Sequence, residues 1–334
     1  MSKNALALVD CSNRDKLFHY LINTVDRKST KKEMISPYDN LQVGAQNIII
    51  TAFGIENRAT LVVKQREDYI KALDKDLAAL DVKKLELSDK DKVQEIAARY
   101  DELSGYEITK LSDASVKNML AVRDKMQTLI YPEIADKELL YFNDFNEKED
   151  KVEDEWINGY ETSKGVWTFS NSTFRLEQKR YNIYHGAWRL YEPIYAQFNS
   201  VSARFKMLNE DEYPGLAFNA TKEGHYQARL KMDYYDDDGN MLPMLQVLRN
   251  DERVFAVYLS GYGVDVKMGE WVDMMMTLVD GNINVYVNDT LIVSFNDSEH
   301  PLHHTVGRAG IYSSGGNVLF DNFAVRGTLA EEPA

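Results

Sequence analysis

The sequence has a single cysteine, Cys11, among its 334 residues. One thiol cannot close a disulfide within the chain, so the fold does not depend on the cross-links of small secreted scaffolds. No apolar run approaches the roughly 18 to 20 residues of a membrane-spanning helix. The first apolar stretch has only five residues before Asp10 and is too short for the core of a signal peptide. We therefore expect no membrane association, and synthesis and folding in a cytoplasm.

The chain also has no excess of positive charge: its formal net charge is −14. This balance argues against a nucleic-acid backbone or an anionic membrane surface as the main partner. Three catalytic signatures are absent as well: a glycine-rich phosphate loop, a paired CxxC and a serine nucleophile elbow. Composition and motifs thus favour a binding or structural protein over the commonest enzyme classes.

The chain does have enough apolar residues for packed cores, at 44% of its length. Its pattern divides it into three zones. Residues 1–64 predict a small mixed α/β segment that anchors the protein, with strands at Asn4–Val9, Gln46–Phe53 and Asn57–Val63 and a short helix at Arg14–Thr24. This segment is where we expect other proteins to attach.

Residues 65–137 predict a helical region. Apolar residues at spacings of three and four form three successive stripes, which are typical of amphipathic helices. The stripes contain Tyr69, Leu73, Leu77 and Leu80; then Val93, Ile96, Ala97, Tyr100 and Leu103; then Val116, Met119, Leu120, Met126 and Leu129. These faces either pack within the chain or form a homo-oligomer, since three modest helices bury little core alone.

From residue 138 to the end at 334 the period changes to two, which predicts an all-β domain. Turn residues separate its strands at the spacing expected of a β-sandwich. The predicted strands cover residues 139–145, 167–169, 174–178, 187–195, 200–208, 215–219, 226–234, 242–249, 254–259, 271–279, 283–287, 290–295, 309–312 and 317–325.

The last two of these strands flank a Ser-Ser-Gly-Gly turn and predict a β-hairpin. Strict alternation places Asp321 on the same face as Leu319, Phe323 and Val325. If that face is the core, the ionised carboxylate needs hydrogen-bond donors, an arginine or a metal as its partner.

Several segments of this domain together resemble the concanavalin A-like lectin/glucanase jelly roll. They are Gly269-Glu-Trp271, Gly281-Asn-Ile-Asn-Val-Tyr-Val-Asn-Asp289, Gly307-Arg-Ala-Gly310 and Phe320-Asp-Asn-Phe323, with Leu140-Tyr-Phe-Asn-Asp-Phe145 as the opening strand. The resemblance covers roughly residues 138–327. It implies an α+β multidomain protein in which a mixed and helical N-terminal region precedes an all-β concanavalin A-like sandwich.

The resemblance also implies two kinds of site. Members of this fold often hold a structural Ca²⁺ between their first and last strands, where Asp144 and Asp321 stand here. A hydrogen-bonded buried Asp321 is the alternative. Sugar-binding members stack aromatic rings on pyranose faces, for which the candidates are Tyr184, Trp188, Arg189, Tyr191, Tyr226 and Arg229. Trp188 faces opposite to Arg189 and Tyr191 along an extended strand, so only one of these sets can line a groove, and a purely structural role is open for most of these aromatic residues.

Hydrolases of this fold carry a Glu-x-Asp-x-x-Glu pattern, which this sequence lacks. We therefore expect a non-enzymatic protein that displays a glycan-binding jelly roll. Because lectin-like domains act outside cells and no export signal is present, we expect a bacteriophage fibre, tail or capsid-surface protein that binds host polysaccharide. The alternatives are a polysaccharide hydrolase or lyase and a purely architectural assembly protein.

Overall fold

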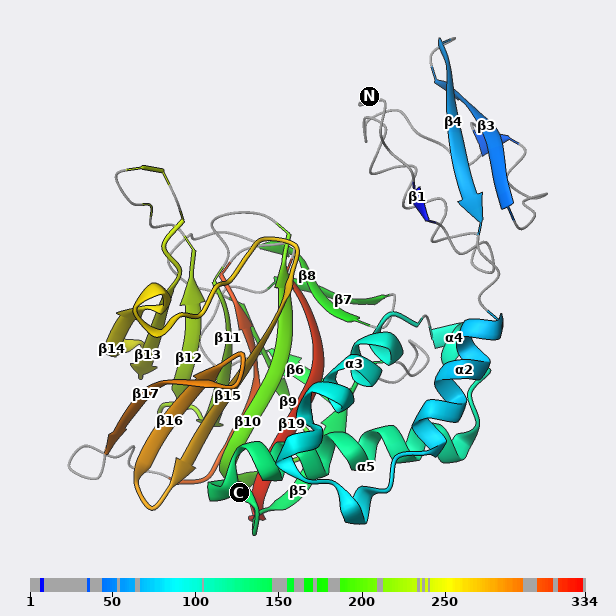
Figure 1. Cartoon of the computed structure of the whole chain (residues 1–334). Helices are drawn as coiled ribbons and strands as arrows, with labels where there is room; N and C mark the ends of the chain where they lie inside the picture. The colour runs from blue at the N-terminus through cyan, green and yellow to red at the C-terminus, as the bar shows by residue number, and fades with distance from the viewer. Residues whose placement is uncertain are drawn as a thin grey trace. The chain divides into compact units, whose positions relative to one another are not determined.

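The computed structural model describes residues 67–332 with gaps, and the backbone of four strands among the first 63 residues (Figure 1). The gaps are at residues 104, 146–154, 159–164, 171–172, 180–186, 209–212, 233–234, 236–237, 240, 297–304 and 315–317. The predicted helix at Arg14–Thr24 and the candidate residue Tyr184 lie outside the described residues.

The chain divides into two compact units, one formed by residues 1–79 and 110–115 and the other by residues 80–109 and 116–334. The first unit contains a sheet of order β1-β4-β3-β2 and the helix α2. Their bounds are β1 Ala7–Leu8, β2 Ile35–Ser36, β3 Gly44–Ala52, β4 Ile55–Val63 and α2 Glu67–Ala78. Within this unit, the Asp74 carboxylate accepts hydrogen bonds from the Ser112 amide and hydroxyl at 2.9 and 3.0 Å.

The second unit begins with helices that pack within the chain, which is the first of the two alternatives for the apolar stripes. Its helical elements are η3 Val82–Lys84, η4 Leu87–Asp89, α3 Lys90–Asp101, α4 Gly105–Ile108, η5 Pro132–Ile134 and, from Val116 onward, α5 Asp113–Ile130. Helix α3 buries Val93, Ile96 and Tyr100, as its spacing predicts. Homo-oligomerisation stays a prediction. Among the described residues, no helix is long and apolar enough to span a bilayer.

The rest of this unit is a sandwich of two antiparallel sheets. The eight-stranded sheet has the order β17-β16-β15-β10-β19-β8-β7, with β5 also paired to β19, and the seven-stranded sheet has the order β14-β13-β12-β11-β18-β9-β6. The strands are β5 Glu138–Asn143, β6 Trp156–Asn158, β7 Gly165–Ser170, β8 Thr173–Lys179, β9 Ala187–Tyr191, β10 Ala196–Met207, β11 Pro214–Ala220, β12 Tyr226–Lys231, β13 Met244–Arg249, β14 Glu252–Tyr258, β15 Trp271–Val279, β16 Asn282–Val287, β17 Thr290–Asn296, β18 Arg308–Ser313 and β19 Val318–Leu329. A short helix, η7 Leu259–Tyr262, follows β14. Two packed antiparallel sheets confirm the β-sandwich that the sequence predicts.

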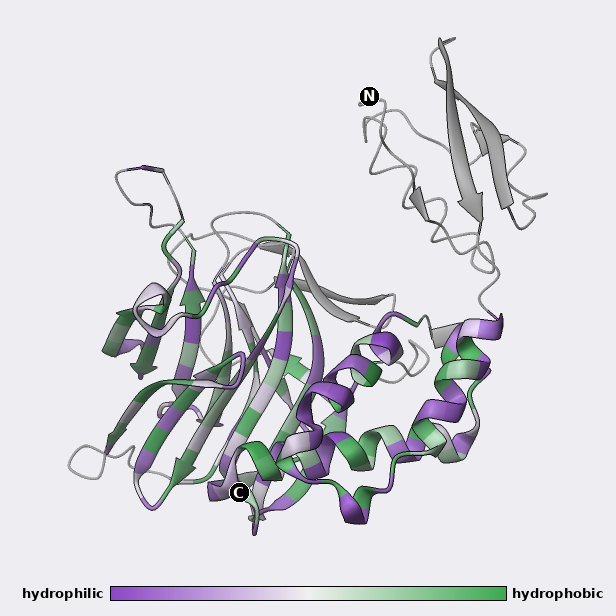
Figure 2. Ribbon diagram, in the orientation of Figure 1, coloured by the Kyte–Doolittle hydropathy of each residue, from purple (hydrophilic) through white to green (hydrophobic). Residues whose placement is uncertain are grey.

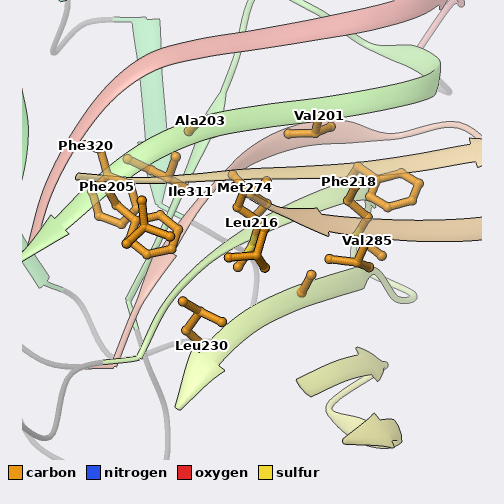
Figure 3. Packing of buried hydrophobic residues seen from close by; sticks show 14 of the residues in the cluster. Val201, Ala203, Phe205, Leu216, Phe218, Leu230, Met274, Val285, Ile311 and Phe320 are labelled. Carbon is orange, nitrogen blue, oxygen red and sulfur yellow. The ribbon is translucent and has the colours of Figure 1, made fainter. Parts of the chain in front are cut away.

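The core lies between the two sheets, where alternate residues of each strand meet. Figure 3 shows Phe205 and Phe320 of one sheet close to Ile311 of the other. The same alternation gives the strands their banded hydropathy in Figure 2. Each inward residue leaves its neighbours to face outward, so the sandwich has two outer faces on which polar side chains gather.

The prediction of a hairpin between residues 309–312 and 317–325 is wrong. Strand β18 pairs with β11 and β9 in the seven-stranded sheet, whereas β19 pairs with β10, β8 and β5 in the eight-stranded sheet. The connection thus crosses from one sheet to the other. The alternating pattern predicts that both segments are strands, but it does not predict which strands each of them pairs with.

The prediction that Asp321 shares a face with Phe323 and Val325 is also wrong. The register of β19 against β10 shifts between the pairs Ser202–Ala324 and Arg204–Asp321, so β19 holds one extra residue there. Asn322 has a φ of 50°, the left-handed conformation that Asn tolerates better than most residues. This bulge keeps Phe320, Phe323 and Val325 in the core and turns Asp321 to the outer face.

Helices α3 and α5 and the short η5 cover that outer face of the eight-stranded sheet. Gln127 of α5 donates a hydrogen bond to the Ser202 hydroxyl of β10 at 3.0 Å, and the Tyr286 hydroxyl of β16 donates to the Glu133 carboxylate at 2.5 Å. Residues 80–109 and 116–137 accordingly belong to the same compact unit as the sandwich. The structure therefore draws no division between units at the sequence-derived boundary of 137 and 138.

Candidate functional site

The outer face of the seven-stranded sheet carries a row of side chains that crosses five strands. The pairing places Gln246 of β13 opposite Arg229 of β12, and Arg229 opposite Gly215 of β11. Gly215 in turn is opposite Tyr312 of β18, which is opposite Trp188 of β9. Residues directly opposite on neighbouring antiparallel strands point to the same face. Five residues that are far apart in the sequence, between positions 188 and 312, thus lie in one line across the sheet.

Arg229 forms hydrogen bonds to two other residues of this row. Its Nε donates a hydrogen bond to Gln246 Oε1 at 3.0 Å, and its Nη1 donates to the Tyr312 hydroxyl at 3.1 Å. The bond to Tyr312 passes over Gly215, where a Cβ would stand 2.3 Å from the Ala228 carbonyl oxygen. Burial raises the pKa of Tyr312, and the Arg229 guanidinium opposes this rise. The tyrosine is therefore a neutral acceptor for the arginine.

The more accessible part of this face lies beside the row. Lys231 Nζ lies 5.5 Å from the centre of the Tyr213 ring, and the Arg229 guanidinium carbon lies 5.9 Å from it. Met244 pairs with both Lys231 and Tyr258, so Tyr258 shares the same face at an exposure of 40%. We call Tyr213, Arg229, Lys231 and Tyr258 the basic face.

The strands under the basic face have an unusual charge for so acidic a protein. The sequences of β9, β11, β12, β13 and β18 contain no Asp or Glu, and β14, which supplies Tyr258, contains only Glu252 at its far end. The charged residues of the first five strands are arginines and a lysine: Arg189, Arg229, Lys231, Arg249 and Arg308. Cationic donors beside tyrosine rings can bind the hydroxyl and carboxylate groups of a sugar while a ring contacts its apolar side.

The structure describes five of the six residues expected to bind sugar and separates them. Trp188 and Arg229 do lie on one outer face, although Trp188 is only 6% exposed. Arg189 points the other way and donates to the Trp156 carbonyl oxygen at 2.7 Å. Tyr191 and Tyr226 lie in the inter-sheet core. A single groove therefore cannot contain all five described candidates, because strand alternation divides them between two faces.

Sequence reasoning did not select Tyr213, Lys231, Tyr258 or Tyr312. For Lys231 a signal was available, because it follows Arg229 by two residues and so shares its face. For Tyr312 the signal was hidden, since its place next to Trp188 depends on β18 joining the seven-stranded sheet. Tyr213 and Tyr258 come from strand ends and depend on register in the same way.

Asp321, the carboxylate expected to need a partner, has an arginine. Two nitrogens of Arg204 donate to its Oδ2, one of them at 3.0 Å, and the Asn322 amide donates to its Oδ1 at 2.7 Å. Arg204 also donates to Asp101 of α3 at 2.5 Å, and Asp101 accepts from Arg123 of α5. Burial raises the pKa of Asp321, and Arg204 opposes the rise. This buried network joins both helices to the sheet.

Asp144, the other expected calcium ligand, accepts a hydrogen bond from the Tyr100 hydroxyl at 3.3 Å. Ca²⁺ needs six to eight oxygen ligands, while the guanidinium of Arg204 already occupies Oδ2 of Asp321. The described residues contain no group of three or more His, Cys, Asp or Glu side chains that could hold a metal. Asp144 and Asp321 thus do not fit a calcium site, and the positive charge near them comes from Arg123 and Arg204.

Neither the protein-family models nor the curated protein sequences give a match to this chain. Solved structures do match the sandwich. A carbohydrate-binding module, CBM66 from Bacillus subtilis, has 13% identity and a TM-score of 0.35 and covers 54% of this chain and 96% of its own. Laminarinase from Flavobacterium sp. UMI-01 has 9% identity and a TM-score of 0.37, and the match covers 57% of this chain and 100% of the laminarinase chain.

The exoplasmic/lumenal domain of VIP36 in its Ca²⁺- and mannose-bound form also matches, at 11% identity and a TM-score of 0.39, with 59% and 94% covered. Binding modules, lectins and enzymes are thus all among the matching structures. The likeness is one of fold, and these ligands and activities belong to the matching proteins.

Proposed function

We propose that this protein binds glycans through the basic face and does not cleave them. The observation that carries the proposal is the cross-strand placement of Arg229 and Lys231 beside Tyr213 on one outer face. Such a face supplies fixed donors and aromatic surface, the two elements of sugar recognition. The positive charges of Arg229 and Lys231 favour glycans that carry carboxylate groups.

The absence of carboxylates supports binding without hydrolysis. Most glycosidases need two carboxyl groups that flank the scissile bond. The strands β9, β11, β12, β13 and β18 supply none, and β14 supplies only Glu252, at the opposite end of the strand from Tyr258. The sequence also lacks the Glu-x-Asp-x-x-Glu pattern. Incubation with polysaccharides that the protein binds should release no reducing ends. Release of such ends would instead support the hydrolase alternative.

The affinity test uses matched glycans and matched variants. We expect the protein to bind a uronate-containing polysaccharide more tightly than the same polysaccharide after its carboxyl groups have been reduced to alcohols. Arg229→Gln and Lys231→Gln should each weaken binding about 10- to 100-fold, because a hydrogen bond to a charged group contributes ~1.5–3 kcal/mol. Calorimetry or biolayer interferometry would measure these affinities.

Lys267→Gln is the control, since Lys267 is an exposed cation in the loop before β15 that pairs with Asp265. It should bind like the unchanged protein. An equal loss of glycan affinity in all three variants would point to nonspecific electrostatic attraction. No binding across a broad glycan panel would contradict the proposal. A stable oligomer with no glycan bound would favour a purely architectural role.

As the setting for this binding we propose the surface of a bacteriophage particle, where the protein would attach the virion to host polysaccharide. The division of the chain into two compact units supports this role, since one unit holds the sandwich and leaves the other to join a partner. Mass spectrometry of gradient-purified particles from the phage that encodes the chain should detect it as a structural component. Its absence from such particles would contradict the virion role without affecting the glycan proposal.

A further inference from the structure

A cleft of about 490 Å³ lies on the side of the sandwich opposite to the basic face. Helices α3 and α5 form one wall, and the outer faces of β10, β15 and β19 form the other. The volume is within the range of small-molecule sites, roughly 300–1,000 Å³. Its apolar lining consists of Val93, Ala97, Ala98, Met126, Ile130, Leu139, Phe142, Ala203, Met274, Met275 and Ala324.

The charged groups of the cleft are unbalanced. Five carboxylates line it against two guanidinium groups, those of Arg123 and Arg204. Both arginines are already engaged, because each donates to Asp101 and Arg204 also donates to Asp321. The cleft therefore has no spare cation among the side chains that line it.

Most of the carboxylates are engaged too, but Asp273 is not. Asp124 pairs with Arg326, and Asp289 pairs with Lys90 at 2.9 Å and accepts hydrogen bonds from Tyr131 at 2.7 Å and Gln94 at 3.0 Å. No hydrogen bond or ion pair joins the Asp273 carboxylate to any side chain that the structure describes. Asp273 is nevertheless exposed within the cleft, next to the indole of Trp271. Arg204 stands opposite Asp273 in the sheet, but its guanidinium already donates to Asp101 and Asp321. The Asp273 carboxylate thus has positive charge nearby but no hydrogen bond to a cation among the described residues.

We propose that this cleft binds an organic ammonium compound, with the cationic nitrogen at Asp273 and an apolar or aromatic body along α5 and Met275. An anion would meet the excess of carboxylates, and a neutral sugar would leave Asp273 without a charged partner. A metal ion is disfavoured, since the described residues hold no cluster of three metal-binding side chains. The proposal stands apart from glycan binding, because it uses other strands and the opposite face.

The pH dependence offers a test that needs no variant. The groups that face Asp273 are Asp101 and Arg123 on the helices, Arg204 on β10 and Asp289 after β16. Although the side chain is open to the cleft, the surrounding protein removes part of its hydration and so raises the pKa of Asp273 above its ordinary value. An alkylammonium stays charged below pH ~9, since amines of this kind titrate near 10. As pH falls through the raised pKa, Asp273 takes up a proton and loses its charge. Ammonium binding should therefore weaken on acidification before ordinary aspartates titrate.

Calorimetry of the full chain with 2-phenylethylammonium, in roughly physiological salt to screen exposed charges, tests the proposal. We expect saturable binding at one site, with 2-phenylethanol at least tenfold weaker because it has the same shape without the charge. Asp273→Asn should lower the affinity for the ammonium at least tenfold. Asp280→Asn is the matched control, since Asp280 is an exposed aspartate in the turn after the same strand.

The proposal is overturned if the ammonium and the alcohol bind equally, or if neither binds. An equal loss of affinity for the ammonium in Asp273→Asn and Asp280→Asn would also overturn it. Should Asp273→Asn fail to fold, the acid-side fall in affinity of the unchanged protein decides: a flat profile contradicts a role for Asp273. Quenching of the indole fluorescence that disappears in Trp271→Phe would place the bound ammonium in this cleft.

Discussion

Replacement of Arg204 by Met should lower the free energy of unfolding by about 3–5 kcal/mol, the usual cost of removing one partner from a buried ion pair. Arg204 and Asp321 are both nearly inaccessible, with side-chain exposures of 9% and 7%. Without the guanidinium, the Asn322 amide is the one remaining donor to Asp321, and Arg123 the one remaining donor to Asp101, among the residues that the structure describes. Urea unfolding followed by circular dichroism would measure the loss.

A double-variant cycle tests whether Arg204 and Asp321 stabilise the fold through each other. Asp321→Asn removes the charge that Arg204→Met leaves unpaired, so the double variant should be more stable than the sum of the single losses predicts. Lys267→Ala is the control, because its ion pair with Asp265 is exposed and should contribute nothing measurable. Additive losses in the cycle, or a loss below about 1 kcal/mol in Arg204→Met, would show that the buried network does not hold the helices on the sheet.

Deletion of Asn322 should abolish folding of the sandwich. Without the bulge residue, either Asp321 must turn into the core or Phe323 and the strand after it must turn out, since a shift by one residue exchanges the faces of a strand. Either outcome costs on the order of the whole stability of a domain, ~5–15 kcal/mol. The deletion variant should be insoluble, or lack the cooperative thermal transition of the unchanged protein.

Asn322→Gly is the matched control for the deletion. It keeps the number of residues and tolerates the positive φ of 50°, but it loses the hydrogen bond that Arg123 donates to the Asn322 side chain at 2.6 Å. We expect a loss of only about 1 kcal/mol from this change. A deletion variant that folds and melts like the glycine variant would show that the bulge does not set the faces of β19.

The sequence predicts the architecture well because the architecture depends on local patterns. Period two marks the strand 271–279 with its observed bounds, and the spacing of Val93, Ile96 and Tyr100 identifies the buried face of α3. Both patterns arise from burial of one side of an element, and that can be read from neighbouring residues.

The candidate site could be predicted only in part, because it depends on pairings between distant strands. The pairs Arg229–Gly215, Gly215–Tyr312 and Tyr312–Trp188 are set by register, and no local pattern fixes the register of one strand against another. Asp321 shows a second limit: the single extra residue at Asn322 reverses the alternation, so the partner is Arg204 on the outer face. The sequence indicated that a buried Asp321 needs a partner and left hydrogen-bond donors, an arginine or a metal open, whereas its location depended on the bulge.

The central position of β19 also bears on how the protein is made. In the eight-stranded sheet β19 stands between β10 on one side and β8 and β5 on the other, yet it ends at Leu329. The strands on its two sides cannot be joined until β19 itself has left the ribosome. The eight-stranded sheet therefore closes long after β5, β8 and β10 have been made, and until then the nascent chain must keep two unfinished strand edges from aggregating.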